Sequence, residues 1–274
     1  WEKSMIEITD FEGITQIKLS REINGQSLFW VSAYLVDDIL IDTGCIHTAE
    51  ELLGFLSDKT ISRVINTHYH EDHVGANRLL EHRRNVRTFA HESSLEFIKK
   101  PPKVPHYREK VWGSPEGSNP VVCPDFIETH RFSFEVVETP GHCPGHISLV
   151  EKRRGWVFSG DLFIGNNLAV AGPENNLTDM LNSMKTLLSK ATSEFTLLTS
   201  LRTIRRDGRK TLSQFVRKYE NLSLKAKELG AQGMEPKQIV VELFGGESVF
   251  DAITGGEYSS ANLVKLLLEA EICC

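Results

Sequence analysis

The chain has 274 residues and a mass of 30.9 kDa, a length that allows one large domain or a core with an appendage. Apolar residues make up 40% and charged residues 25%, which excludes a disordered or collagen-like protein, and no apolar run is long enough to predict a membrane span. The formal net charge of −6 disfavours nucleic acid as a partner of the whole surface. Five cysteines without a Cys-x-x-Cys pair predict reduced thiols and a cytoplasmic protein.

Short strands and helices are expected to alternate along the first hundred residues. Apolar periodicity predicts strands at 14–19, 31–36, 39–42, 63–66 and 88–91. The same analysis predicts helices at 49–56, 77–82 and 93–100. This alternation is typical of a layered α/β domain.

The next segment, residues 101–125, contains six prolines, so we expect a loop without regular structure that acts as a lid or a binding loop. Beyond it we expect strands at 132–138, 147–151, 156–160 and 195–198, and a helix at 178–190 with Thr178 as its N-cap. After residue 210 the pattern is helical at 211–229, 236–243 and 260–269, with glycines between. We therefore expect a main domain at 1–210 and a helical C-terminal appendage at 211–274 packed on it.

Histidines gather in residues 67–73, which read THYHEDH directly after a predicted strand. Residues two apart in extended backbone point the same way, so His68 and His70 can converge on one point. Asp72 and His73 follow on the turn into the next helix. Three imidazoles and a carboxylate in six residues are typical of a zinc or iron site.

Three further segments place polar side chains on turns at strand ends. His142 and His146 lie in residues 139–146, TPGHCPGH, and Asp161 ends a predicted strand in Ser-Gly-Asp. Asp42 ends an earlier strand, and Cys143 is either a small buried filler or a metal ligand. An aspartate at a strand end is by itself a weak signal, but the order of these segments is specific.

In that order the motifs resemble the metallo-β-lactamase superfamily, over about residues 10–205. The resemblance implies an αββα sandwich with the metals at one edge of two packed sheets. It further implies a first metal held by His68, His70 and His142. A second metal would be served by Asp72 and His73, with Asp161 bridging both.

The same resemblance implies supporting roles for Asp42 and His146, which would orient the ligands through hydrogen bonds. The form of residues 139–146 is closest to the hydroxyacylglutathione-hydrolase-like and thioesterase-like branch. One departure stands out: the family usually has a last histidine ligand after the strand here expected at 195–198, and this chain has no histidine after His146. The second position should therefore bind metal more weakly and admit iron or manganese as readily as zinc.

In place of that histidine, residues 202–210 bring five positive charges and one negative charge. One hypothesis is a solvated loop. The other is an anion clamp for a substrate phosphate or carboxylate, formed by Arg202, Arg205 and Arg206.

These observations predict a hydrolase that activates water on one or two Zn²⁺ ions and cleaves an ester, thioester or lactone of a small molecule. Asp72 and Asp161 would orient the nucleophile and transfer its proton. Three alternatives stay open at this point. They are a mono-iron persulfide-dioxygenase-like enzyme using His68, His142 and Asp161, a hydrolase of RNA phosphodiesters, and a non-catalytic ligand-binding module.

Overall fold

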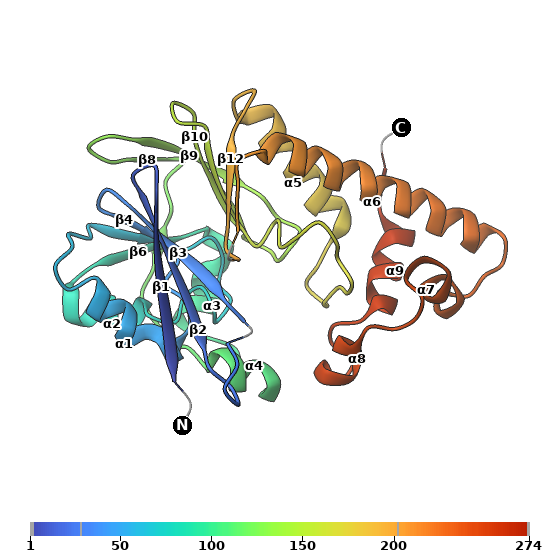
Figure 1. Cartoon of the computed structure of the whole chain (residues 1–274), viewed down its shortest axis with the longest axis horizontal. Coiled ribbons are helices and arrows are strands. Elements are labelled where there is room, and N and C mark those ends of the chain that lie inside the picture. Colours follow the sequence, from blue (N-terminus) through green and yellow to red (C-terminus); the bar gives the residue numbers. More distant parts are fainter. Residues whose placement is uncertain (1–2, 28, 202, 273–274) are drawn as a thin grey trace.

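Two β-sheets pack face to face in the computed structural model, which describes residues 3–27, 29–201 and 203–272 (Figure 1). The seven strands of the first sheet follow one another in chain order: β1 (Ser4–Phe11), β2 (Ile14–Arg21), β3 (Val31–Val36), β4 (Ile39–Ile41), β5 (Arg63–Ile65), β6 (Arg87–Ala90) and β7 (Val121–Val122). The second sheet has the order β13-β12-β11-β10-β9-β8, formed by β8 (Phe126–Glu128), β9 (Ser133–Glu138), β10 (Ile147–Glu151), β11 (Trp156–Gly160), β12 (Thr196–Thr199) and β13 (Ile204–Arg205).

Helices cover both outer faces of the sheets. The first sheet is covered by α1 (Ala49–Phe55) and α2 (Asn77–Arg84), and the second by α5 (Leu177–Lys190) and α6 (Gly208–Ala231). The remaining helices are α3 (Leu95–Lys99), α4 (His106–Trp112), α7 (Pro236–Phe244), α8 (Val249–Thr254) and α9 (Ser260–Glu269). The αββα arrangement expected from the sequence is thus confirmed, and a helical C-terminal region follows it.

Side-chain alternation explains why the first sheet can be covered on both faces. Ile39 and Ile41 of β4 point into the core between the sheets, whereas Leu40 between them joins the cluster under α1 and α2. All three side chains are fully buried or nearly so, as expected for a short central strand.

Parallel pairing brings the candidate site residues to one edge of the sandwich. β4 pairs with β5 in parallel, so Asp42 and the histidine segment both follow the carboxyl ends of these strands. β11 pairs with β12 in parallel, which places Asp161 and Ser200 together at the end of the second sheet.

The expectation for residues 101–125 was wrong in part. The segment contains α4 and the edge strand β7, because its prolines cluster at the two ends and leave residues 106–112 free to form a helix. The predicted cap of α5 was also displaced, since Asn176 rather than Thr178 accepts the hydrogen bond of the first turn, from the Asp179 amide. Strands β1, β7, β8 and β13 were not expected.

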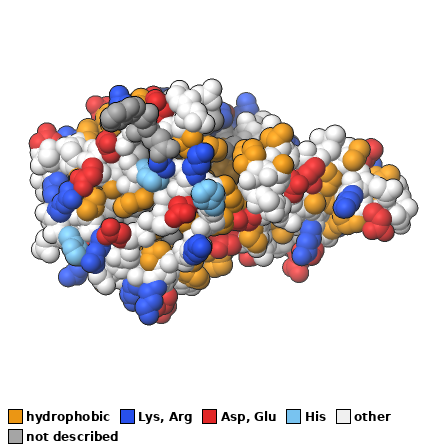
Figure 2. Space-filling view, turned by 90° about the horizontal axis from the view of Figure 1, so that it is seen from below, with side chains coloured by type: hydrophobic (Ala, Val, Ile, Leu, Met, Phe, Trp, Pro, Cys, Tyr) orange, Lys and Arg blue, Asp and Glu red, His pale blue; other side chains and the backbone are white. Residues whose placement is uncertain are grey.

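Beyond β13, helix α6 packs on α5, and α7 and α9 pack on α6 (Figure 1). The division of the chain at residue 210 into a domain and an appendage remains a prediction. None of the described helices is long and apolar enough to cross a membrane. Charges of both signs are interspersed over the face shown in Figure 2.

One consequence of this packing is measurable on Phe215 of α6. Its buried ring contacts Phe163, two residues after Asp161, with ring centroids 5.7 Å apart, and lies against Tyr219. We expect Phe215→Ala to lower the free energy of unfolding by about 3–5 kcal/mol, because a large buried ring leaves a cavity. Leu224→Ala on the same helix, where the side chain is 49% exposed, should change it by less than about 0.5 kcal/mol. Urea unfolding measures both; equal effects would contradict the packing described.

Candidate metal centre

The buried carboxylate of Asp42 organises the histidine segment. Its Oδ1 accepts a hydrogen bond from the Thr67 amide at 2.8 Å, and its Oδ2 accepts one from the Thr67 hydroxyl at 2.8 Å. Oδ2 also accepts from Nδ1 of His73 at 2.8 Å. Asp42 thus joins the start of the histidine segment to His73 through hydrogen bonds.

The hydrogen bonds of Thr67 fix the proton on His68. Since the single hydroxyl proton of Thr67 is donated to Asp42, its oxygen accepts from Nδ1 of His68, 3.0 Å away. Nε2 of His68 is therefore the unprotonated nitrogen. Burial, together with the neighbouring histidines, holds the pKa of His68 well below its usual value, so the ring is neutral.

A carboxylate fixes the proton on His70 in the same way. Nε2 of His70 lies 2.8 Å from Oε2 of Glu174 and donates to it, so a neutral His70 has its lone pair on Nδ1. This hydrogen bond also lowers the pKa of Glu174. Glu174 lies in the segment just before α5 and was not singled out by the sequence.

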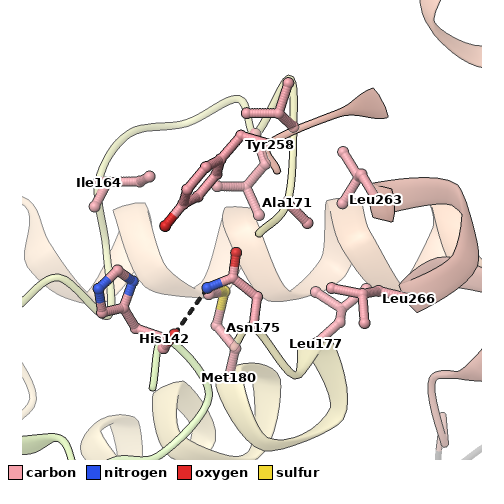
Figure 3. A pocket seen from close by; sticks show the side chains of 11 residues that line it. His142, Ile164, Ala171, Asn175, Leu177, Met180, Tyr258, Leu263 and Leu266 are labelled. Atoms are coloured by element: carbon pink, nitrogen blue, oxygen red, sulfur yellow. Dashed lines mark hydrogen bonds between the residues drawn. The ribbon is translucent and has the colours of Figure 1, made fainter. Parts of the chain in front are cut away.

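The turn that holds His142 is clamped by the segment before α5. The side-chain amide of Asn175 donates to the carbonyl oxygen of His142 at 2.8 Å (Figure 3). The backbone amide of Asn176 donates to the Gly141 carbonyl at 2.8 Å. Gly141 has φ +131°, and a Cβ there would lie 2.3 Å from the backbone nitrogen of Met180. Only glycine lets α5 approach this turn so closely.

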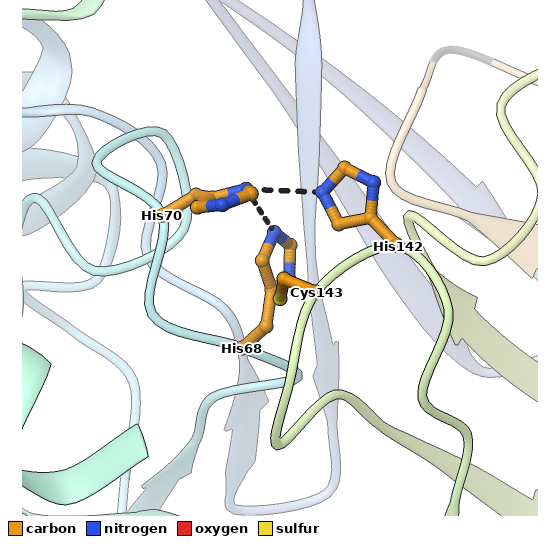
Figure 4. Close-up of side chains that lie close together, drawn as sticks. All are labelled: His68, His70, His142 and Cys143. Atoms are coloured by element: carbon orange, nitrogen blue, oxygen red, sulfur yellow. Dashed lines mark hydrogen bonds between the residues drawn. The ribbon is translucent and has the colours of Figure 1, made fainter. Parts of the chain in front are cut away.

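Imidazole nitrogens from the two segments converge (Figure 4). Nδ1 of His70 lies 3.1 Å from Nε2 of His68 and 3.0 Å from Nε2 of His142. With His68 and His70 both neutral, these nitrogens present lone pairs to each other, so a proton or a metal ion must lie between them. Burial lowers the pKa of His142, against the opposing effect of Asp161, so this ring is neutral as well. The three side chains fit a divalent metal.

Cys143 completes this group, since its sulfur and the three histidine nitrogens all lie within 4.8 Å of one another. The thiol is buried with Tyr69, Val74, Ala90 and Ile98, and burial raises its pKa well above the usual value. The side chain is therefore packed as a small apolar filler and is also within reach of the centre.

A second group gathers around His73. Because Nδ1 of His73 donates to Asp42, its Nε2 faces the carboxylates of Asp161 and Asp72 at 3.4 and 3.6 Å. Among the described residues this buried Nε2 has no hydrogen-bond partner. Burial alone would lower the pKa of His73, but the three surrounding aspartates raise it well above the usual value. A positive charge is thus favoured here, as a proton or as a metal ion.

Asp161 lies between the two groups. Its Oδ1 faces His73, as above, and its Oδ2 lies 3.6 Å from Nε2 of His142. Burial alone would raise its pKa, but His73, His142 and the Ser200 hydroxyl lower the pKa overall, so the carboxylate is ionised. This position fits the bridging role implied by the sequence.

Ser200 occupies the place after β12 where the family's last histidine is missing. Its hydroxyl hydrogen-bonds Oδ1 of Asp161 and lies 3.1 Å from the Gly160 carbonyl oxygen. In the next residue, Leu201, the backbone carbonyl accepts a hydrogen bond from the Ser32 hydroxyl. Ser200 is therefore the residue after β12 whose side chain contacts the second group, through Asp161.

His146 contacts the end of β11, where Asp161 lies. Its Nε2 accepts from the Asp161 amide at 3.1 Å, and its Nδ1 lies 2.9 Å from the Thr139 hydroxyl. Burial lowers its pKa to about 3, so the ring is neutral. The lone pair on Nε2 is the one that accepts from the Asp161 backbone amide. A Cβ on Gly160, whose φ is +48°, would come within 2.6 Å of this ring. His146 thus binds the backbone of Asp161.

The arginine segment lies elsewhere, and Arg202 falls outside the described residues. β13 turns back along β12, so Arg205 lies opposite Leu197 rather than beyond Ser200. Arg206 pairs with Glu12 at 2.8 Å and covers the ring of Phe11, at the β1–β2 turn. That turn is at the opposite end of the first sheet from Asp42, since Ile14 pairs with Val36. The structure does not bring Arg205 and Arg206 to the histidines.

Comparison with known proteins agrees with this geometry. Residues 30–212 match the model of the Metallo-beta-lactamase superfamily, and the chain belongs to that superfamily. It is a metallo-hydrolase of that class. Among curated relatives, the hydroxyacylglutathione hydrolase GloC of Haemophilus influenzae is 26% identical over 54% of this chain and 72% of its own length. The hydroxyacylglutathione hydrolase of Vibrio cholerae is 30% identical over 56% of this chain and 52% of its own length.

Solved structures show the same fold. TTHA1429, a metallo-beta-lactamase family protein of Thermus thermophilus, superposes with a TM-score of 0.67 at 19% identity, over 94% of each chain. TTHA1623, solved in a di-iron-bound form, has a TM-score of 0.55 at 25% identity, over 68% of this chain and 94% of its own.

The role of Asp42 leads to a first prediction for this site. We expect Asp42→Asn to lower the free energy of unfolding by about 3 kcal/mol, because charge-assisted hydrogen bonds from Thr67 and His73 are lost. Metal content should fall as well, since the protons on His68 and His73 are no longer fixed. Urea unfolding and element analysis measure the two effects. Asp58→Asn, at an exposed turn, is the control and should match the unmodified protein. A variant with normal metal content would show that Asp42 does not organise the ligands.

Proposed function

We propose that the chain hydrolyses an ester, thioester or lactone of a small molecule with one or two zinc ions held by the centre described above. His68, His70 and His142 would hold the first ion, and Asp72, His73 and Asp161 the second. The hydroxyacylglutathione hydrolases among the relatives, by their name thioester hydrolases, favour this substrate class.

The observation that supports this proposal best is the contact between Nε2 of His68 and Nδ1 of His70, 3.1 Å apart in a buried site. Hydrogen bonds on the opposite side of each ring turn these two nitrogens towards each other, so a proton or a metal ion must lie between them, and Nε2 of His142 faces the same point. When bound, zinc lowers the pKa of water to about 7 and polarises a carbonyl oxygen.

The chain's own carboxylates supply the rest of the chemistry. Asp161, ionised and held by Ser200 and His146, would orient the attacking water between the two groups. Asp72, on the other side of His73, would take part in moving the proton of that water to the leaving group.

A single-iron oxygenase is the alternative that one observation favours. His142 and Asp161 lie 3.6 Å apart, His68 is grouped with Asp161, and Ser200 replaces the last histidine. Such an enzyme needs a three-residue set with open positions. His70 presents a further lone pair to the same point, which favours the hydrolase. Iron together with oxygen consumption on a persulfide would decide for the oxygenase.

The site assignment is tested by removing one ligand from each segment. We expect His68→Ala and His142→Ala each to abolish hydrolysis of p-nitrophenyl acetate and to lose at least one equivalent of zinc by element analysis. Both side chains stand on turns, so the circular dichroism spectrum should be retained. His82→Ala, at a position of α2 outside the site, is the matched control and should keep activity and metal. Full activity in either ligand variant would overturn the assignment.

Ser200 leads to a second test, on metal stoichiometry. The first position has three imidazoles, whereas the second has two carboxylates and one imidazole with a hydroxyl beside them. Stepwise chelation should therefore remove one equivalent well before the other. Ser200→His should tighten the weaker equivalent by about tenfold or more, and Leu201→His should not, because the side chain that contacts Asp161 is that of Ser200. Two equally tight metals in the unmodified protein would contradict this assignment.

A further inference from the structure

A small pocket of about 70 Å³ adjoins His142 between α5, α9 and the loop after β11 (Figure 3). Most of its wall is aliphatic, including Ile164, Val170, Leu177, Met180, Leu263 and Leu266. Its polar groups are few. Asn175 is already bonded through both ends of its amide, to the His142 carbonyl and the Gly172 nitrogen. The other two are His142 itself and Tyr258.

Tyr258 reaches this pocket from the segment between α8 and α9. Its ring lies so close to Gly172 that a Cβ there would be 2.6 Å away. Figure 3 shows its hydroxyl directed to the end of the pocket where His142 lies. Burial raises the pKa of this phenol, which keeps it a hydrogen-bond donor.

Several contacts hold the segment that contains Tyr258 against the loop after β11. Ala171 and Ser259 exchange backbone hydrogen bonds of 3.1 and 3.3 Å, and the Ser260 hydroxyl donates to the Ala169 carbonyl at 2.9 Å. Glu257 lies 3.7 Å from Arg108. The C-terminal helices are thus fixed against the loop that lines the pocket.

The pocket's size limits what it can hold. A cavity of about 10–15 Å³ is enough for one water molecule, and an apolar protein cavity of about 150 Å³ binds benzene. A volume of about 70 Å³ therefore suits an aliphatic group of about two to four carbons. Charged groups are excluded, because the aliphatic wall offers them no partner.

We propose that this pocket binds the acyl group of the substrate, a short uncharged aliphatic chain, with the scissile carbonyl beside His142 and within reach of the Tyr258 hydroxyl. This inference rests on the proposed hydrolase function. We assign the acyl group to the pocket, so the leaving group lies outside it. Esters that differ only in the leaving group test this choice.

A series of p-nitrophenyl esters of rising acyl length tests the inference on the full, zinc-loaded chain. We expect kcat/KM to rise by about fourfold for each methylene from acetate to butyrate, as each is removed from water, and to fall at octanoate. A second series of acetate esters with larger leaving groups should show no such optimum. A flat acyl profile, or an optimum that follows the leaving group instead, would overturn the proposal.

Variants of α9 locate the effect. Leu266→Ala should move the optimum to a longer acyl chain, and Leu266→Phe should favour acetate over butyrate by about tenfold or more. Leu268 is the matched control: it lies on the same helix and is also half-buried, but it packs towards Gly230 and away from the pocket. Leu268→Ala and Leu268→Phe should keep the profile of the unmodified protein. If the Leu266 and Leu268 variants change it alike, the pocket is not the acyl site.

Binding of butyramide, followed by NMR titration in the millimolar range, separates this proposal from the hydrolase function. Butyramide binding that Leu266→Phe abolishes and Leu268→Phe retains would support the pocket even if no ester were hydrolysed, in which case the proposed function alone fails. Ester hydrolysis without acyl selectivity and without butyramide binding would overturn the pocket and leave the hydrolase intact.

Discussion

The hydrogen bonds received by the buried Asp42 carboxylate determine where the protons of the centre lie. Thr67 donates its only hydroxyl proton to Asp42, so it can accept from His68 and must leave Nε2 of that ring bare. His73 donates Nδ1 to the same oxygen, so its Nε2 faces Asp161 and Asp72. One carboxylate thereby turns the Nε2 atoms of two histidines inward, and the carboxylate of Glu174 turns Nδ1 of His70 inward in the same way.

Packing between the sheets supplies the other half of the centre. His142 and Asp161 belong to the second sheet's loops, and they meet the first sheet's histidines only because aromatic and aliphatic residues of both sheets form one core. The close approach of α5 at Gly141 then lets Asn175 and Glu174 contact both halves. The ligand geometry thus depends on long-range packing as much as on the local motif.

This division explains what the sequence could and could not predict. The strands around Asp42 and His68 and the strands of the β10–β11 hairpin follow from apolar alternation and turn residues, which are local signals. The αββα layer order was instead implied by the resemblance to the superfamily. Glu174, Ser200 and the pair of Glu71 with Arg108 were missed because their partners lie far away in sequence. The clustered arginines left an anion clamp and a solvated loop open from composition alone; β13 pairs with β12 and turns Arg206 towards Glu12.

Arg108 lies on α4, within residues 101–125 that were expected to be a loop, and it contacts the metal loop. Glu71 is buried directly beside Asp72, and a second negative charge there would hinder ionisation of that carboxylate. Arg108 of α4 binds both oxygens of Glu71 at 2.7 Å and so cancels the charge. The same guanidinium faces Glu257, which precedes Tyr258. Because a buried arginine left without either partner is costly, the helix at 106–112 holds the metal loop and the C-terminal segment together through these two ion pairs.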